Sequence, residues 1–266
     1  MLMWWDSVAI ALVLLLGVPH GGLDAAVARR VGWPAGVLPW LYFHAAYIGL
    51  ALLVVGLWWW LPLLSLSLFL LISAVHFAAS DLVGLQRQWL PWIAHGGLIT
   101  VAVPVLQREA VEPLFALLVG GDAAALMQIL TMVFPLWLLS LVGYCRVSYR
   151  QRSYRKPLSQ LVALLLCALV LPPLVSFAVY FCLSHSPGHM RREWQQLKPQ
   201  ERRRGIYELV SYTLLAWAAG GAVFWLLSGA PSALWLQITF IGLAALTVPH
   251  MLLVDWASNK RRASGV

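Results

Sequence analysis

The sequence predicts an all-α fold: a polytopic membrane helical bundle of about eight transmembrane segments, with a re-entrant or broken helix pair at residues 158–190. Of the 266 residues, 61% are hydrophobic and only 11% are charged, and the mean hydropathy is +0.80. Such a composition cannot cover a soluble surface. The apolar residues gather in stretches of about 20, the length that spans a ~30 Å hydrocarbon core. Basic residues lie in short clusters beside these stretches, so the net charge of +8 reflects membrane topology rather than nucleic-acid binding.

Seven of the stretches have the length of a single crossing, and a longer one covers 158–190. The first ends in "HGGLD" instead of a small-residue cleavage site, and no basic region precedes it, so we expect a first helix and not a signal peptide. No linker or soluble segment is long enough to stand alone, and residues 1–266 are predicted to form a single integral membrane domain. The single-crossing stretches are 8–28, 40–61, 63–85, 90–107, 124–145, 207–228 and 234–256.

The basic clusters predict which side of the membrane each loop occupies, because cytoplasmic loops are enriched in Lys and Arg. With the N-terminus outside, a single crossing by 158–190 would place the last two clusters outside. If that segment returns to the same side, Arg108 is the only basic residue left outside. Pro172 and Pro173 lie at its middle, and 33 residues are too few for two full crossings, so a re-entrant or broken helix pair is expected. The clusters are Arg29–Arg30, Arg87, Arg146–Lys156, Arg191–Arg204 and Lys260–Arg262.

Histidines recur at one depth in this topology. Counted towards the nearest cytoplasmic basic residue, His20 lies 9 residues away, His76 lies 11, His185 lies 6 and His250 lies 10. The spread is about 8 Å at 1.5 Å per residue. Ionisable side chains inside a bilayer are costly and mark functional sites. A metal site is therefore predicted, although any one of these histidines could instead bond helices together.

The stretch "SHSPGH" is the strongest local motif. His185 and His189 are four residues apart, so on a continuous helix they share one face, as paired metal ligands do. Pro187 indicates that a helix begins near Ser186. His44, which has no Asp partner, is interpreted as structural or cavity-lining. His95, close to the interface, is a weaker ligand candidate.

An Asp follows three of the histidines and could orient metal-bound imidazoles, because such a ring commonly donates its second N–H to a carboxylate. Asp24, four residues after His20, is placed to serve that His. Asp81 and Asp255 come five residues after a His and are expected to serve a neighbour instead. An interfacial charge, or a salt bridge with nearby bases, is the alternative for each. All-imidazole ligation suits Zn, Cu, Fe or Ni without choosing among them; a haem with two His ligands would leave the other histidines unexplained.

The ordered motifs "VPHGGLD", "SAVHFAASD", "YFCLSHSPGH" and "VPHMLLVD" resemble the Brp/Blh-type β-carotene 15,15′-dioxygenases nearly from end to end. The resemblance implies a multi-pass enzyme of the inner (cytoplasmic) membrane that uses iron(II) and O2 to cleave the central double bond of β-carotene into two all-trans-retinal molecules. It also implies a functional link to a microbial rhodopsin, which takes retinal as its chromophore. Ala78 replaces the glycine expected after "HF", a small change.

Carried over residue by residue, the family's iron ligands match His20, His76, His185 and His189. The same resemblance implies no catalytic side chain beyond the metal centre. Four further residues are predicted to surround the ligands or to line the pocket: His250, Asp24, Asp81 and Asp255.

Two other functions fit parts of the pattern. Intramembrane His and Asp residues also form relays in metal or proton transporters; a transporter would alter metal tolerance, whereas a dioxygenase would produce retinal. A di-iron desaturase needs about eight histidines in several boxes, and this chain has seven with one such pair.

Overall fold

The computed structural model describes residues 2–85, 88–227 and 234–263, and every regular element in these ranges is a helix. The prediction of an all-α membrane fold is confirmed. Arg87 lies outside the described residues, as do the side chains of Arg261 and Arg262. Within the described residues, seven helical stretches are long and apolar enough to cross a membrane, and each coincides with a predicted crossing: Trp4–Arg30, Val37–Trp60, Pro62–Asp81, Trp89–Leu106, Ala124–Arg150, Pro199–Leu226 and Leu234–Ser258.

The chain falls into two compact units. Unit 1 comprises Met1–Ile10 and Leu61–His185, and unit 2 comprises Ala11–Trp60 and Ser186–Val266. The chain therefore passes between the units at three points, one of them directly after His185. The grouping of all 266 residues in a single domain stays a prediction.

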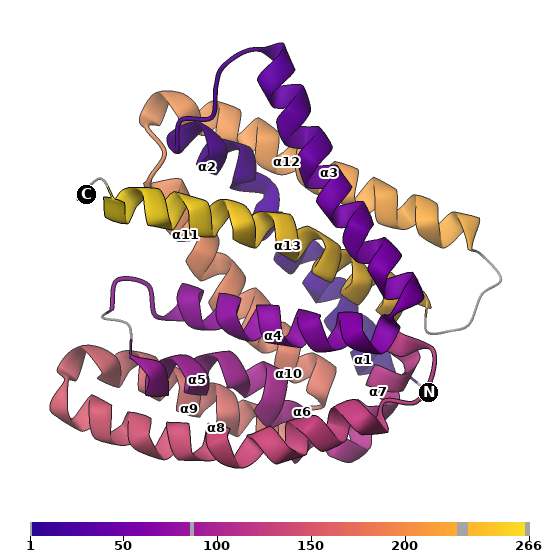
Figure 1. Ribbon diagram of the computed structural model, residues 1–266, viewed down its shortest axis with the longest axis vertical. Helices are drawn as coiled ribbons and strands as arrows, with labels where there is room; N and C mark the ends of the chain where they lie inside the picture. The colour runs from indigo at the N-terminus through magenta and orange to yellow at the C-terminus, as the bar shows by residue number, and fades with distance from the viewer. Residues whose placement is uncertain (1, 86–87, 228–233, 264–266) are drawn as a thin grey trace. The chain divides into compact units, whose positions relative to one another are not determined.

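Unit 1 is built around α4, α5 and α8, of which α5 packs against both of the others (Figure 1). Its core centres on Trp137, whose indole N–H donates to the carbonyl oxygen of Ala94 at 3.0 Å. Gly97 permits this close packing, since a Cβ there would lie 2.4 Å from the indole. The elements are α4 (Pro62–Asp81), α5 (Trp89–Gly97), η3 (Leu98–Ala102), α6 (Val103–Leu106), α7 (Arg108–Val119), α8 (Ala124–Arg150), η4 (Arg152–Tyr154), α9 (Arg155–Val170), α10 (Pro173–Val179) and η5 (Tyr180–His185).

The predicted break in 158–190 is confirmed, because α9 ends at Val170 and α10 begins at Pro173. The Gln107 side-chain amide donates to the carbonyl oxygens of Ala168 and Leu171, which the end of α9 leaves without helical partners. Gln107 follows the end of the crossing that begins at Trp89.

The second half of the pair returns towards the opposite end of unit 1. In η5, the Tyr180 hydroxyl donates to Asp81, the last residue of α4. Asp81 lies next to the connection that leads to Trp89, at the other end of that crossing from Gln107. The segment therefore goes out along α9 and comes back through α10 and η5, as expected of a helix pair.

Unit 2 places α13 against α2, α3 and α12 (Figure 1). Gly22 lets α12 approach η2, because a Cβ at Gly22 would lie 3.0 Å from the backbone of Leu209. Gly22 thus permits close packing of the two elements. The elements are η1 (Val13–Gly17), η2 (Val18–Leu23), α2 (Asp24–Arg30), α3 (Val37–Trp60), α11 (Ser186–Gln195), α12 (Pro199–Leu226) and α13 (Leu234–Ala263); α1 (Trp4–Leu12) runs across the boundary between the units.

Three π-helices each end two residues before a proline: η1 before Pro19, η3 before Pro104 and η5 before Pro187. A proline ring lacks the N–H that would bond the carbonyl four residues earlier and clashes with that carbonyl. The wider π turn moves the carbonyl away from the ring. Prolines thus cause the irregular helix turns that precede His20 and contain His185.

Candidate metal centre

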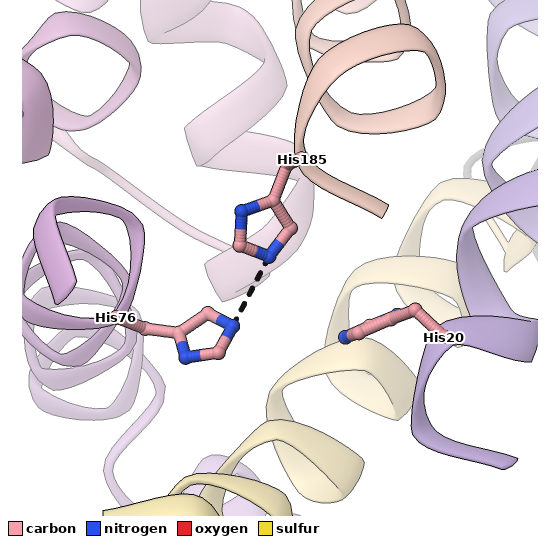
Figure 2. A group of neighbouring side chains, drawn as sticks. All are labelled: His20, His76 and His185. Atoms are coloured by element: carbon pink, nitrogen blue, oxygen red, sulfur yellow. Dashed lines mark hydrogen bonds between the residues drawn. The ribbon is translucent and has the colours of Figure 1, made fainter. Parts of the chain in front are cut away.

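His76 and His185 face each other inside unit 1 (Figure 2). His76 projects from α4, and His185 is the last residue of η5; both are buried. Their Nε2 atoms lie 3.1 Å apart. Two imidazoles bound at neighbouring positions of one metal ion, each at about 2.1 Å, place their nitrogens about 3.0 Å apart. The pair is therefore arranged as two metal ligands would be.

Asp81 lies behind His185. One carboxylate oxygen is 3.7 Å from Nδ1 of His185, and the other is 3.5 Å from Nδ1 of His95 and accepts the Tyr180 hydroxyl at 2.9 Å. The Nδ1 side of His185 thus faces a carboxylate, while its Nε2 faces His76, which is the usual orientation of a metal-bound imidazole. Asp81 thus faces a neighbouring His and not its own His76, as its spacing predicts, and its part in orienting a metal ligand stays a prediction.

His95 belongs to a buried polar chain that continues from Asp81. Its Nε2 lies 3.3 Å from the Tyr144 hydroxyl, which in turn donates to the carbonyl oxygen of Tyr154 at 3.3 Å. His95 thus contacts the carboxylate that faces His185. This placement makes it a support for the candidate ligands of unit 1.

Three buried histidines gather in unit 2. His20 comes from η2, His189 from α11 and His250 from α13. Their ring centroids are 5.0–5.9 Å apart, with the rings edge to face. Nδ1 of His20 is bonded to the carbonyl oxygen of Gly17 at 2.6 Å, which fixes the direction of the ring. Buried imidazoles grouped in this way can bind a metal ion.

Asp24 pairs with His250 and not, as expected, with its own His20. Its Oδ1 lies 2.8 Å from Nδ1 of His250, and its Oδ2 accepts the Tyr47 hydroxyl at 2.8 Å. The reason is local: residues 18–23 form a 3₁₀-helix, with three residues per turn. A residue four positions on is then rotated about 120° away instead of about 40°, so the carboxylate points from His20 towards α13.

A mostly apolar cavity of about 240 Å³ adjoins this cluster inside unit 2. His20 and His250 line it, and so does His44, whose Nε2 lies 2.8 Å from the Tyr212 hydroxyl. The interpretation of His44 as a cavity-lining residue is confirmed. Asp255 is exposed on α13, which agrees with the alternative role given for it, an interfacial charge.

The structure thus joins His76 with His185 in unit 1, and His20 with His189 and His250 in unit 2. The assignment of His20, His76, His185 and His189 to one ion stays a prediction. Sequence reasoning missed the tyrosines that hold the two carboxylates, Tyr47 and Tyr180, because an isolated Tyr in an apolar helix carries no signal of its partner. It also missed two ion pairs that attach α2 to the rest of unit 2: Arg29–Glu208 at 2.5 Å and Arg30–Glu193 at 2.6 Å.

Residues 11–258 match the protein family described as β-carotene 15,15′-dioxygenase. The β-carotene 15,15′-dioxygenase of uncultured marine bacterium 66A03 is 37% identical over 267 residues, which cover 96% of this chain and 94% of that protein. The probable β-carotene 15,15′-dioxygenase Blh of Halobacterium salinarum is 25% identical over 290 residues, covering 93% and 82%. No solved structure matches the chain. Since these matches run over nearly its whole length, the chain belongs to the β-carotene 15,15′-dioxygenase family.

Proposed function

We propose that this protein cleaves the central 15,15′ double bond of β-carotene with O2 to give two molecules of all-trans-retinal. One C=C bond breaks and two C=O bonds form, so both oxygen atoms of O2 end in the two aldehydes and no proton is gained or lost. Family membership carries this proposal. The membrane-spanning helices support it, because a C40 hydrocarbon partitions into the bilayer.

The proposal includes iron(II) held by His20, His76, His185 and His189. The 3.1 Å separation of the Nε2 atoms of His76 and His185 supports it in unit 1, and the ring contact of His20 with His189 supports it in unit 2. That the four share one ion rests on the similar sequence distances of His20, His76 and His185 from cytoplasmic basic residues, and on the family motifs, which add His189. When bound, iron(II) would supply the activation of O2, since imidazole suits iron and four ligands leave positions open.

The protein's own contribution is to bind and orient the substrate and to exclude water from the site. Asp81 faces Nδ1 of the His185 ring, and the rings of Phe77 and Phe181 cover that ring, with centroids 4.9 Å and 5.6 Å from its own. The buried site holds the reacting bond in place, which is an effect of orientation. No acid or base is required from a side chain, because the net reaction transfers no proton.

The location of the enzyme and the use of its product belong to the same proposal. We place the chain in the inner (cytoplasmic) membrane, with its basic clusters on the cytoplasmic side. Retinal released there would supply a microbial rhodopsin in the same membrane. Co-expression with an opsin would test this link, since the cells should gain the absorption band of the retinal-bound pigment only when the cleavage enzyme is active.

Expression in a bacterium that accumulates β-carotene tests the reaction. We expect loss of the orange colour and a single C20 aldehyde, retinal, in the extract. Two apocarotenals of unequal length would show that another bond is cleaved. Altered metal tolerance without retinal would favour the His- and Asp-based transporter instead.

Single substitutions test the ligand set. His20→Ala, His76→Ala, His185→Ala and His189→Ala should each lower the iron content of the purified protein and abolish retinal formation, whereas His44→Ala should keep the iron. Metal analysis alongside retinal yield provides the comparison, and the wild-type protein shows whether iron or another metal is bound. Full iron content in any of the four variants would remove that residue from the ligand set.

A further inference from the structure

The cavity of unit 2 has a shape suited to binding part of a long apolar molecule. It follows α13 from His250 to Leu243, seven residues or about 10 Å along a helix. His20 and His250 line one end of this run. Its 240 Å³ is smaller than the roughly 300–1,000 Å³ of pockets that enclose a whole drug-sized ligand. The cavity is therefore suited to one end of a longer molecule.

Several polar groups on the cavity wall are engaged with one another. Tyr47 donates to Asp24, which is also bonded to His250, and His44 is bonded to the carbonyl oxygen of Trp40 and to the Tyr212 hydroxyl. Because these partners are already satisfied, an apolar guest would not leave them without hydrogen bonds. A hydrocarbon can therefore occupy the space without a desolvation penalty at these groups.

The cavity reaches the surface of unit 2 between α3 and α12. Ile48 on α3 is 57% exposed and Leu215 on α12 is 64% exposed, and both line the cavity. These two helices are candidate membrane crossings and only 6% of each apolar window is buried. The side of the cavity marked by Ile48 and Leu215 therefore faces lipid, from which an apolar molecule can enter.

We propose that this cavity binds one half of the carotenoid substrate, with its β-ionone ring seated near Leu243 and Ala216 and its polyene leading to His250 and His20; this rests on the proposed function. In an extended polyene, nine bonds separate the ring from the central double bond. At the advance of an extended chain, about 1.2 Å per bond, this is roughly 11 Å. That length matches the distance from Leu243 to His250 along α13.

Filling the ring seat tests the proposal. Ala216→Phe would place a phenyl group in the cavity, and Ala218→Phe, on an exposed position of α12 that does not line the cavity, is the matched control. Leu246→Trp on α13 is a second filling variant, with the exposed Leu252→Trp as its control. Binding of β-carotene and of lycopene, a C40 carotenoid with open-chain ends, is measured without oxygen in lipid nanodiscs, together with iron content.

We expect the wild-type protein to bind β-carotene at least tenfold more tightly than lycopene. Ala216→Phe and Leu246→Trp should weaken β-carotene binding at least tenfold and remove the preference for the ring, with iron content unchanged, while both controls behave as wild type. Wild-type β-carotene affinity in the filling variants would overturn the proposal and leave an acyl chain as the occupant. If one filling variant loses its iron or aggregates, β-carotene binding by the other filling variant tests the proposal.

Retinal formation by the wild-type protein is measured in parallel. Retinal from the wild type with unaltered β-carotene binding in the filling variants would reject the ring seat and keep the proposed reaction. Ring-dependent β-carotene binding without any cleavage would reject the reaction and keep the seat.

Discussion

Asp81 is the side chain that connects the candidate ligands of unit 1 to their surroundings. It faces Nδ1 of His185 and of His95 and accepts the Tyr180 hydroxyl. We expect Asp81→Asn to lower iron affinity by about 10–100-fold, because a carboxylate behind an imidazole fixes the ring and strengthens it as a ligand. Iron retention against a graded series of chelator concentrations measures this.

Asp255→Asn provides the control for Asp81, since it removes a carboxylate that follows a His by the same five residues but is exposed on α13. Its iron retention should equal that of the wild type. An equal loss in both variants would mean that overall charge, and not the contact with His185, sets the affinity.

Single residues also show where sequence reasoning stops. The placement of Asp81 beside a neighbouring His was predictable from spacing, because Asp81 lies in a regular α-helix. The partner of Asp24 was not predictable in this way, because residues 18–23 form a 3₁₀-helix and not an α-helix. The contribution of Tyr47, on another helix, depends on packing that no local pattern encodes.

At the scale of elements, the packing of η2 against α12 positions His20. A Cβ at Gly22 would lie 2.7 Å from the side chain and 3.0 Å from the backbone of Leu209. Gly22→Ala should therefore lower the free energy of unfolding by about 1–3 kcal/mol, as overpacking does, and should reduce bound iron because η2 must move. Thermal unfolding in detergent and metal analysis check both effects.

Gly49→Ala is the matched substitution, because nothing lies within 4 Å of a Cβ at Gly49 in α3. Alanine is favoured over glycine in a helix by about 1 kcal/mol, so this variant should be as stable as the wild type or more so. Comparable destabilisation by the two substitutions would contradict a specific contact between η2 and α12.

The π turn that ends at His185 is a second element with a testable cause. Pro187→Ala restores the N–H that the ring removes, so η5 can tighten into an α-helix and turn His185 away from His76. We expect iron content to fall with little loss of thermal stability. Pro104→Ala, which relaxes η3 in the same way, should leave iron unchanged; equal iron in both variants would separate the π turn from metal binding.

Apolar crossings were predictable because their signal is composition over about 20 residues. Elements with a polar face were not: α7, which carries Glu109 and Glu112, was absent from the prediction, and α12 begins at Pro199, well before its apolar part. The break at Pro172 was predictable, since proline acts through local sterics. Its capping by Gln107 was not, because that contact joins residues 61 and 64 positions apart.

On the scale of the whole molecule, the charge pattern and the hydrogen bonds of the broken helix pair give the same account of topology. Gln107 meets the end of α9 next to Arg108, the basic residue expected outside. Tyr180 meets Asp81 at the other end of unit 1, where Gln88 is bonded to Gln151 in the basic cluster expected inside. The pair therefore brings the chain back to the end of unit 1 from which α9 starts, which agrees with the expected cytoplasmic position of Arg191–Arg204.

Cysteine accessibility tests this topology in intact cells. In a background without the three native cysteines, single cysteines at Ser153 and Gln196, both exposed positions, should be shielded from a membrane-impermeant reagent. A cysteine at Glu109, exposed at the start of α7, should react, which shows that the reagent reaches the outer face. All three should react once the membrane is permeabilised.

Labelling at only one of Ser153 and Gln196 would show that 158–190 crosses once. His250 would then lie in the opposite leaflet from His20, yet both belong to the histidine cluster of unit 2, with ring centroids 5.1 Å apart. Two helices that cross the membrane can bring such rings together only if both are at the same depth. The contact between the His20 and His250 rings therefore predicts the labelling result. Shielding of both Ser153 and Gln196 is the result compatible with the histidine cluster of unit 2.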